Sequence, residues 1–204
     1  MPYKPNQREY RAFSGEFHTS APASDGQKAY TVEGYATTFD EPYELFRDAD
    51  GTAYYECVRS TALAGAYMDD VIFQLNHEGA PAARLRNGSM TLEADAHGLK
   101  VTARLDGSRE ARDLYEAISN GLIDRMSWGF TVPADGWEWD EQTRTSYINK
   151  VSKVFDVSAV SLPANEGTEI HARSYLDGVI EAEKRESLLR DMELREREAL
   201  AITL

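Results

Sequence analysis

Short segments with the character of β-strands, separated by turn residues, fill most of this 204-residue chain. The clearest are the alternating stretch at residues 99–105 and the largely apolar runs at residues 125–132 and 151–162. Too few helices separate these segments for parallel βαβ winding, which needs a crossover helix between successive strands. The pattern predicts a mainly β chain with helices (α+β), in which an antiparallel sheet is closed or nearly closed into a barrel.

Turn and capping residues mark the ends of several elements. Residues 109–120 are predicted as the clearest helix, since Ser108 can cap its first turn and Gly121 stands where helices commonly end. Asn87 and Gly88 form a pair well suited to a two-residue hairpin turn, because both central positions need a positive φ. We therefore expect a hairpin centred on this pair.

The composition changes near the C-terminus. Residues 1–175 are expected to form one domain, whereas residues 176–204 are dense in glutamate and arginine and are expected to form a charged helical tail. No apolar run approaches the roughly 18 residues that a membrane span needs, and the N-terminus lacks the apolar centre of a secretion signal. These features predict a chain that stays in the compartment where it is made.

Charge and cysteine content exclude further classes of protein. A net charge of −13 disfavours binding to nucleic acid or to anionic lipid, because both require Lys and Arg to neutralise negative charge. The single cysteine, Cys57, rules out an internal disulfide and fits a reducing cytoplasm. The sequence contains no phosphate-binding loop, no metalloprotease helix and no paired-cysteine motif, so we expect neither a cofactor nor a metal.

Three residues have contexts that suit acyl-transfer chemistry. His77 follows a predicted strand at residues 71–75, Ser127 lies in a strand close to a glycine, and Asp156 stands alone in an apolar run. Each residue also has a noncatalytic interpretation, because a histidine at a turn is often a surface residue and a serine in a strand often has no role beyond packing. A carboxylate in a buried strand needs a partner, which makes the role of Asp156 either structural or catalytic.

Two weaker patterns point to other chemistry. Asp48 and Asp50 hint at a calcium loop, but their spacing does not fit the known pattern. Glu138 and Asp140 are a conceivable carboxylate pair for carbohydrate chemistry, although exposed acids are expected by chance in so acidic a chain.

Four stretches of the sequence together resemble the tailed-phage prohead serine protease family, whose fold is related to that of the herpesvirus assemblins. The combination of Asn-His, then Met-Ser-x-Gly-Phe, then an acidic residue before Val-Ser is specific, whereas any one piece would be weak. The matching stretches are VEGYATTFD at 32–40, DVIFQLNHEG at 70–79, GLIDRMSWGFTV at 121–132 and KVFDVSAVSLPANEGTEI at 153–170.

The resemblance assigns a role to each candidate residue. By position, His77 matches the general base, Ser127 the nucleophile and Asp156 the acidic member of a catalytic triad. The family often has glutamate at the acidic position, and the herpesvirus enzymes use a second histidine, so His171 is the competing candidate. Backbone N–H groups or Arg125, which shares a strand face with Ser127, are candidate oxyanion donors.

The implied function is that of a serine endopeptidase that processes phage capsid scaffold or precursor segments, and itself, during prohead maturation. The expected partners are the major capsid protein precursor or a scaffold segment as substrate and further copies of the chain, with no nucleic acid and no membrane. The expected location is the host cytoplasm, inside the assembling prohead. The alternative is a noncatalytic capsid assembly or scaffold component in which the His, Ser and Asp are structural.

Overall fold

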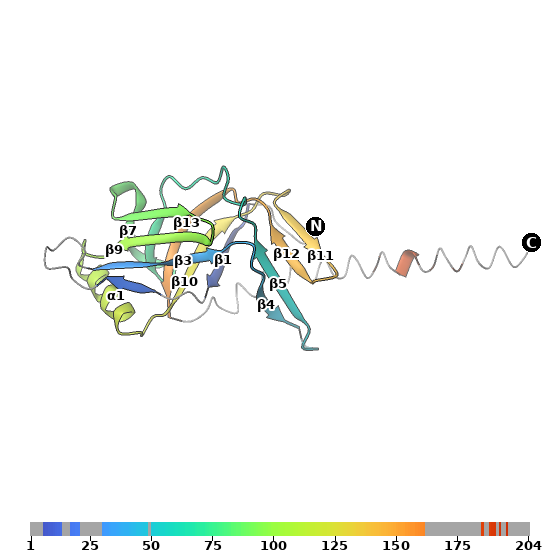
Figure 1. The fold of residues 1–204 in the computed structure, drawn as a ribbon, viewed down its shortest axis with the longest axis horizontal. Helices are drawn as coiled ribbons and strands as arrows, with labels where there is room; N and C mark the ends of the chain where they lie inside the picture. Colours follow the sequence, from blue (N-terminus) through green and yellow to red (C-terminus); the bar gives the residue numbers. More distant parts are fainter. Residues whose placement is uncertain are drawn as a thin grey trace, which may run out of the picture.

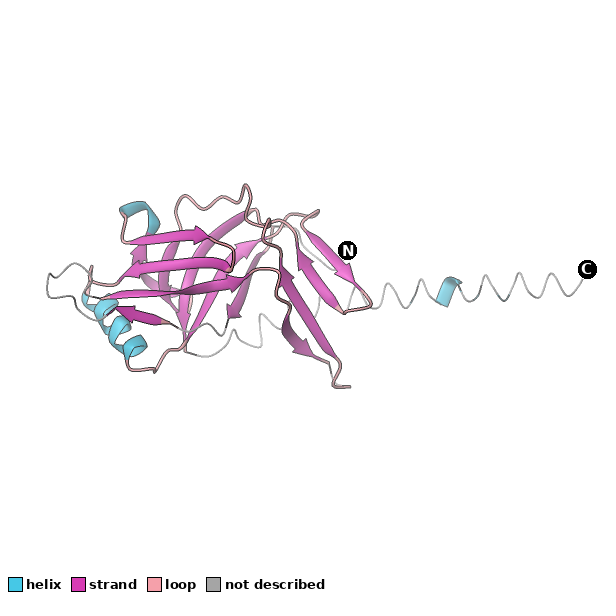
Figure 2. Ribbon diagram, viewed as in Figure 1, coloured by secondary structure: helices cyan, strands magenta, loops and turns pink. Residues whose placement is uncertain are grey.

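The computed structural model describes residues 6–13, 17–20, 30–48 and 50–161, together with a few helical residues between 185 and 195. Within residues 6–161 the described regular structure consists of thirteen strands, one α-helix and one short 3₁₀-helix. Figure 2 shows that strands are the predominant regular element of the folded part.

The largest sheet, here called the site sheet, has five strands in the order β1-β10-β13-β6-β7. Its strands β13 and β6 run parallel, and the other neighbouring pairs are antiparallel. The strands are β1 (Arg8–Phe13), β6 (Ile72–Leu75), β7 (Glu78–Arg84), β10 (Arg125–Thr131) and β13 (Lys153–Val160).

Two four-stranded sheets complete the β structure, as Figure 1 shows. The second sheet contains β2 (His18–Ser20), β3 (Thr31–Thr38), β9 (Gly98–Arg104) and β8 (Met90–Ala94), in that order. The third contains β11 (Trp137–Asp140), β12 (Thr145–Ile148), β5 (Ala53–Val58) and β4 (Tyr43–Arg47), with β12 and β5 parallel.

The predicted closed or nearly closed antiparallel barrel is wrong. The described strands form three separate sheets, and none of them closes on itself. The alternation of side chains predicts where strands lie, but closure depends on which strands pair, and two of the pairs here are parallel pairings between distant segments. The predicted tail at residues 176–204 falls almost wholly outside the described residues.

The predicted hairpin at Asn87-Gly88 is also wrong, although the turn itself is present. Gly88 has a φ of 73° and ends a short 3₁₀-helix at Leu85–Asn87. The strands on either side belong to different sheets, since β7 pairs with β6 and β8 pairs with β9. The turn therefore carries the chain from the site sheet to the second sheet.

The predicted helix is confirmed as α1 (Arg109–Ser119). The backbone N–H of Ala111 donates to the Ser108 hydroxyl at 3.0 Å, which satisfies one free donor of the first turn. Leu114 and Ile118 on the inner face are buried. The helix packs beside β7 at one end of the molecule (Figure 1).

The main core lies between the site sheet and the second sheet and includes Trp128, Phe130 and Val101. The rings of Trp128 and Phe130 stack with their centroids 4.0 Å apart. Because side chains alternate along a strand, burying Trp128 in this core turns Ser127 and Gly129 toward the opposite face of β10. The core thus fixes which face of the sheet carries the candidate site.

A buried ionic cluster joins the site sheet to the third sheet. Arg11 on β1 donates to both oxygens of Glu56 on β5, at 2.8 and 3.0 Å, and to Glu9 at 3.2 Å. The Tyr43 hydroxyl also donates to Glu56. Burial alone would lower the pKa of Arg11, but the two carboxylates outweigh it and raise that pKa above its ordinary value.

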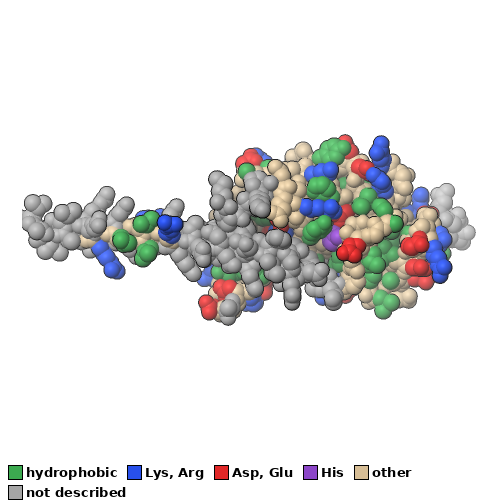
Figure 3. All heavy atoms as spheres, turned by 180° about the vertical axis from the view of Figure 1, so that it is seen from behind, with side chains coloured by type: hydrophobic (Ala, Val, Ile, Leu, Met, Phe, Trp, Pro, Cys, Tyr) green, Lys and Arg blue, Asp and Glu red, His purple; other side chains and the backbone are tan. Residues whose placement is uncertain are grey.

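On the face shown in Figure 3, acidic and basic side chains are mixed over the folded part. None of the helices within the described ranges is long and apolar enough to cross a membrane.

Candidate active site

The three candidate residues come from three adjacent strands of the site sheet. In the antiparallel pairing of β10 with β13, Ser127 lies opposite Ser158 and Gly129 lies opposite Asp156. Residues directly opposite each other on paired strands share a face, so Ser127 and Asp156 point to the same side. His77 follows the end of β6, which neighbours β13 on its other side.

A tight turn brings the His77 ring over this face. Asn76 and His77 have φ values of 51° and 60°, which is left-handed backbone that asparagine tolerates and histidine adopts less often. The Asn76 N–H donates to the Ala159 carbonyl at 2.9 Å, extending the β6–β13 ladder by one residue. Its side-chain carbonyl accepts from the Ser161 N–H at 3.0 Å. These bonds hold a conformation that otherwise costs about 1 kcal/mol or more.

His77 bridges the other two candidates. Its Nε2 lies 2.7 Å from the Ser127 hydroxyl oxygen, and its Nδ1 contacts Oδ2 of Asp156. Ser127 and Asp156 have no exposed surface, whereas the His77 side chain keeps 16% of its own. The structure therefore brings together the three residues singled out in the sequence.

Asp156 is held by more than the imidazole. The guanidinium of Arg8 pairs with Oδ1, and the Ser158 hydroxyl donates to Oδ2 at 3.0 Å. Burial alone would raise the pKa of Asp156, but the contacts with His77 and Arg8 outweigh it and lower that pKa below its ordinary value. The carboxylate is therefore ionised at neutral pH, as its role beside an imidazole requires.

Two side chains of β1 pack around the pair. The Tyr10 ring lies with its centroid 4.3 Å from that of His77, tilted by 57°. The Arg8 guanidinium carbon lies 5.0 Å from the centre of the Tyr10 ring. These contacts restrict the position of the imidazole ring beside Asp156.

Because Gly129 has no side chain, there is room beside it for the contacts among Asp156, Arg8 and Tyr10. A Cβ added there would collide with Oδ1 of Asp156 and would lie 3.0 Å from Tyr10 Cε1 and 3.2 Å from Arg8 Nε. Only glycine allows β10 to pass this close to the buried carboxylate.

Sequence reasoning missed Arg8, Tyr10 and Ser158 as members of the site. Ser158 lies in the quoted stretch at 153–170 and would have been found by its i+2 spacing from Asp156 on one strand face. Arg8 and Tyr10 had no such signal, because they reach the site only through the pairing of β1 with β10.

The structure describes no contact between the alternative candidates, Arg125 and His171, and the site. The Arg125 guanidinium lies 3.7 Å from Asp124, and no contact with Ser127 is seen. His171 lies outside the described residues. Among the described residues, Asp156 is the carboxylate in contact with His77.

The two weaker patterns have structural explanations. One carboxylate oxygen of Asp48 accepts two backbone N–H groups of its own loop. Glu138 accepts from the Asn149 amide at 3.1 Å, and Asp140 accepts two N–H groups of the next turn. Among the residues that the structure describes, no group of three or more His, Cys, Asp or Glu side chains could hold a metal ion.

A hydroxyl, an imidazole and a buried carboxylate in this order form the arrangement of a serine hydrolase. Comparison with known proteins identifies the particular group. Residues 16–179 match the model of the caudovirus prohead serine protease family. The chain is also 30% identical, over 169 residues, to the prohead protease of Enterobacteria phage HK97, an alignment that covers 82% of this chain and 70% of that protein. No solved structure matches the chain. The chain belongs to the caudovirus prohead serine protease family, a family of proteases of phage prohead maturation.

Proposed function

We propose that this protein is a serine endopeptidase in which Ser127 is the nucleophile, His77 the general base and Asp156 the residue that orients the base. The observation that carries the proposal is the double contact of the His77 ring, with Ser127 on one nitrogen and Asp156 on the other. A structural histidine would need only one of these partners. The use of both, on a strand face fixed by the core, is what acyl transfer requires.

The two contacts of His77 determine the donor and the acceptor of each proton transfer. The Nδ1–H of neutral His77 donates to Asp156, which leaves the Nε2 lone pair facing the Ser127 hydroxyl. As Oγ attacks the peptide carbonyl carbon, its proton moves to Nε2, and Asp156 stabilises the imidazolium that forms. Nε2 then returns the proton to the leaving amine as the C–N bond breaks. Water repeats the sequence on the acyl-enzyme and restores Ser127.

The proposed substrates are scaffold or capsid precursor segments of the same phage and the chain itself, inside the prohead assembling in the host cell. We further propose that residues 1–175 form the catalytic domain, that residues 176–204 form a charged tail, and that the enzyme works as a homo-oligomer. Family membership supports the capsid substrate, because prohead maturation is where these proteases act.

The decisive experiment compares wild type with Ser127→Ala, each co-expressed with the capsid precursor of the same phage. Intact mass should show cleaved precursor with wild type only. Ser146→Ala is the matched control, because Ser146 is also a buried strand serine but lies in the third sheet. We expect a fluorophosphonate probe to label wild type and this control at Ser127. Cleavage by Ser127→Ala would refute the assignment, and folded wild type that neither cleaves nor is labelled would favour a noncatalytic assembly component.

A further inference from the structure

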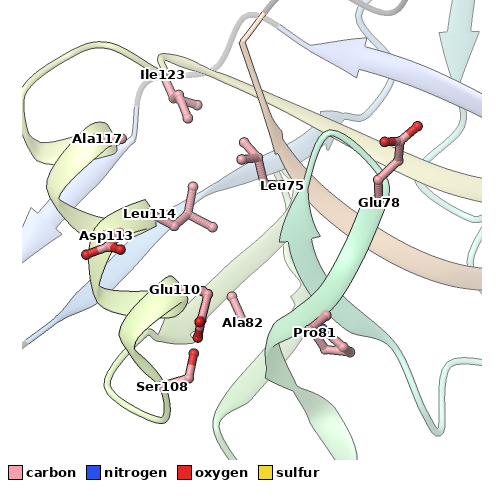
Figure 4. A pocket seen from close by; sticks show the side chains of 11 residues that line it. Leu75, Glu78, Pro81, Ala82, Ser108, Glu110, Asp113, Leu114, Ala117 and Ile123 are labelled. Carbon is pink, nitrogen blue, oxygen red and sulfur yellow. The ribbon is translucent and has the colours of Figure 1, made fainter.

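An apolar groove of about 400 Å³ opens between α1 and β7, at the end of the site sheet that carries the Asn76–His77 turn. Figure 4 shows Leu114 of the helix, Ile123 after it and Leu75 at the end of β6 pointing into this space. Leu75 is one of the large apolar side chains that remain exposed, with 39% of its surface accessible.

Two chain segments connect residues that line the groove with residues of the triad. Leu75 and Glu78 line it and stand on either side of the Asn76–His77 turn that positions the base. Ile123 lines it from the segment that leads into β10 and Ser127. Leu75 pairs with Ala159, one residue past the Ser158 that faces the triad, so its side chain lies on the other face of the sheet. A peptide bound across the triad therefore reaches the groove around the end of the sheet that carries the His77 turn.

One wall of the groove also suits an extended peptide. β7 is the last strand in the order of the site sheet, so its outer side has no neighbouring strand within the described part of the chain. An edge strand offers unpaired backbone groups to an added strand. Pro81 removes one N–H from this edge but leaves the carbonyls and the other donors.

Carboxylates at the groove make it selective for charge. Glu78, Glu110 and Asp113 line it beside the apolar side chains. Asp113 has Arg109 at 3.9 Å, but in the described ranges neither Glu78 nor Glu110 forms an ion pair. Backbone and Ser108 hydrogen bonds at the start of α1 lower the pKa of Glu110, so this carboxylate is ionised at neutral pH.

We propose that this groove binds a part of the substrate peptide that passes around the end of the site sheet from the triad, and that it accepts a lysine or arginine side chain. The aliphatic stem of such a side chain packs on Leu75, Leu114 and Ile123, and its cationic end reaches Glu78 and Glu110. This inference rests on the proposed protease function and adds to it the class of side chain that the substrate carries.

The test has a cleavage arm and a binding arm. In the first, the full chain digests a peptide library of natural sequences, and mass spectrometry gives the residue preference at each position around the cleaved bonds. We expect Lys and Arg to be enriched at one position. The double variant Glu78→Gln/Glu110→Gln should lose this preference by about tenfold, since each exposed ion pair changes binding by about two- to fivefold. Glu116→Gln, an exposed position on the same helix that does not line the groove, is the matched control.

The binding arm separates the inference from the proposed function. Fluorescence anisotropy measures binding of labelled peptides that differ only in Lys, Gln or Glu at the preferred position, using Ser127→Ala so that no peptide is cleaved. If the library yields no cleaved bond, the peptides carry the variable residue at the centre of a fixed apolar sequence. Tighter binding of the lysine peptide, weakened by the double variant and by added salt, supports the groove even if wild type cleaves nothing.

Three results would overturn the proposal. One is cleavage without a basic preference at any position. Another is a basic preference that the double variant leaves unchanged. The last is a groove occupied by a second copy of the chain, which light scattering would show as loss of a dimer in the double variant with peptide binding unaltered.

Discussion

Replacing Gly129 by alanine tests whether the packing around Asp156 matters for catalysis. The added methyl group would occupy the place of Oδ1 of Asp156, with Tyr10 and Arg8 at 3.0 and 3.2 Å from it. The carboxylate is buried and has partners on both oxygens, so it has no free direction in which to retreat. Either Asp156 moves away from His77 or β10 separates locally from β13.

The structure sets the expected size of the effect. Overpacking of this kind costs about 1–3 kcal/mol of unfolding free energy, which corresponds to a fall in melting temperature of roughly 2–12 °C for a domain of this size. A misplacement of the orienting carboxylate by about 1 Å is expected to lower turnover by a further ~100-fold. Gly129→Ala should therefore lose far more activity per folded molecule than its stability loss explains.

Two other glycines provide the controls. Gly98→Ala would place its Cβ against the Thr37 carbonyl on the second sheet, so it should lower the melting temperature and leave turnover per folded molecule near that of wild type. A Cβ at Gly107 meets nothing within 4 Å, so Gly107→Ala should change neither quantity appreciably. The assay is thermal unfolding together with the cleavage rate at a temperature where every variant is folded. Equal turnover per folded molecule in Gly129→Ala and Gly98→Ala would refute the reasoning.

Four further predictions follow from the contacts of the site and of the buried ion cluster. Asp156→Asn should lower turnover by as much as ~10⁴ with the fold retained, because an amide favours the wrong imidazole tautomer; a large melting shift with only a proportionate rate loss would instead assign Asp156 a structural role. Because the pKa of Asp156 is lowered on folding, its stabilising contribution is complete above the unfolded value of about 4 and is lost as the pH falls through the lower folded value; acid titrations of unfolding free energy should therefore be steeper below about pH 4 for wild type than for Asp156→Asn. Arg8→Gln should lower turnover per folded molecule, because it removes the cation that holds Oδ1 of Asp156, and turnover equal to that of wild type would assign this arginine a purely structural role. Arg11→Met should lower the unfolding free energy by about 3–5 kcal/mol, since it leaves Glu56 buried without its cation, and a denaturant midpoint equal to that of wild type would contradict this.

Local elements of the fold could be predicted from the sequence because their signals are local. The helix α1 has its cap at Ser108 and its turn glycine at Gly121, and both act within a few residues of the helix ends. The strand before His77 and the strand around Ser127 were predicted for the same reason. Pairing is a different matter, because the residues at Asn87-Gly88 specify a sharp turn but do not specify that the two strands it joins should pair.

The positions of the triad residues and of the residues that support them depend on which strands pair. This explains why the supporting residues were missed. His77 stands at its place because β6 lies parallel to β13 with Leu75 opposite Ala159, and the ladder continues one residue further before the chain turns. A slip of one residue would shift the turn by about 3.3 Å along the strand and reverse the faces of β6. The pairing of β1 with β10 delivers Arg8 in the same way. Motif residues such as Ser127 can be found one by one, but the groups that hold them in place are set by register. Register depends on contacts between segments that are distant in the sequence, as Arg8 and Asp156 are, 148 residues apart.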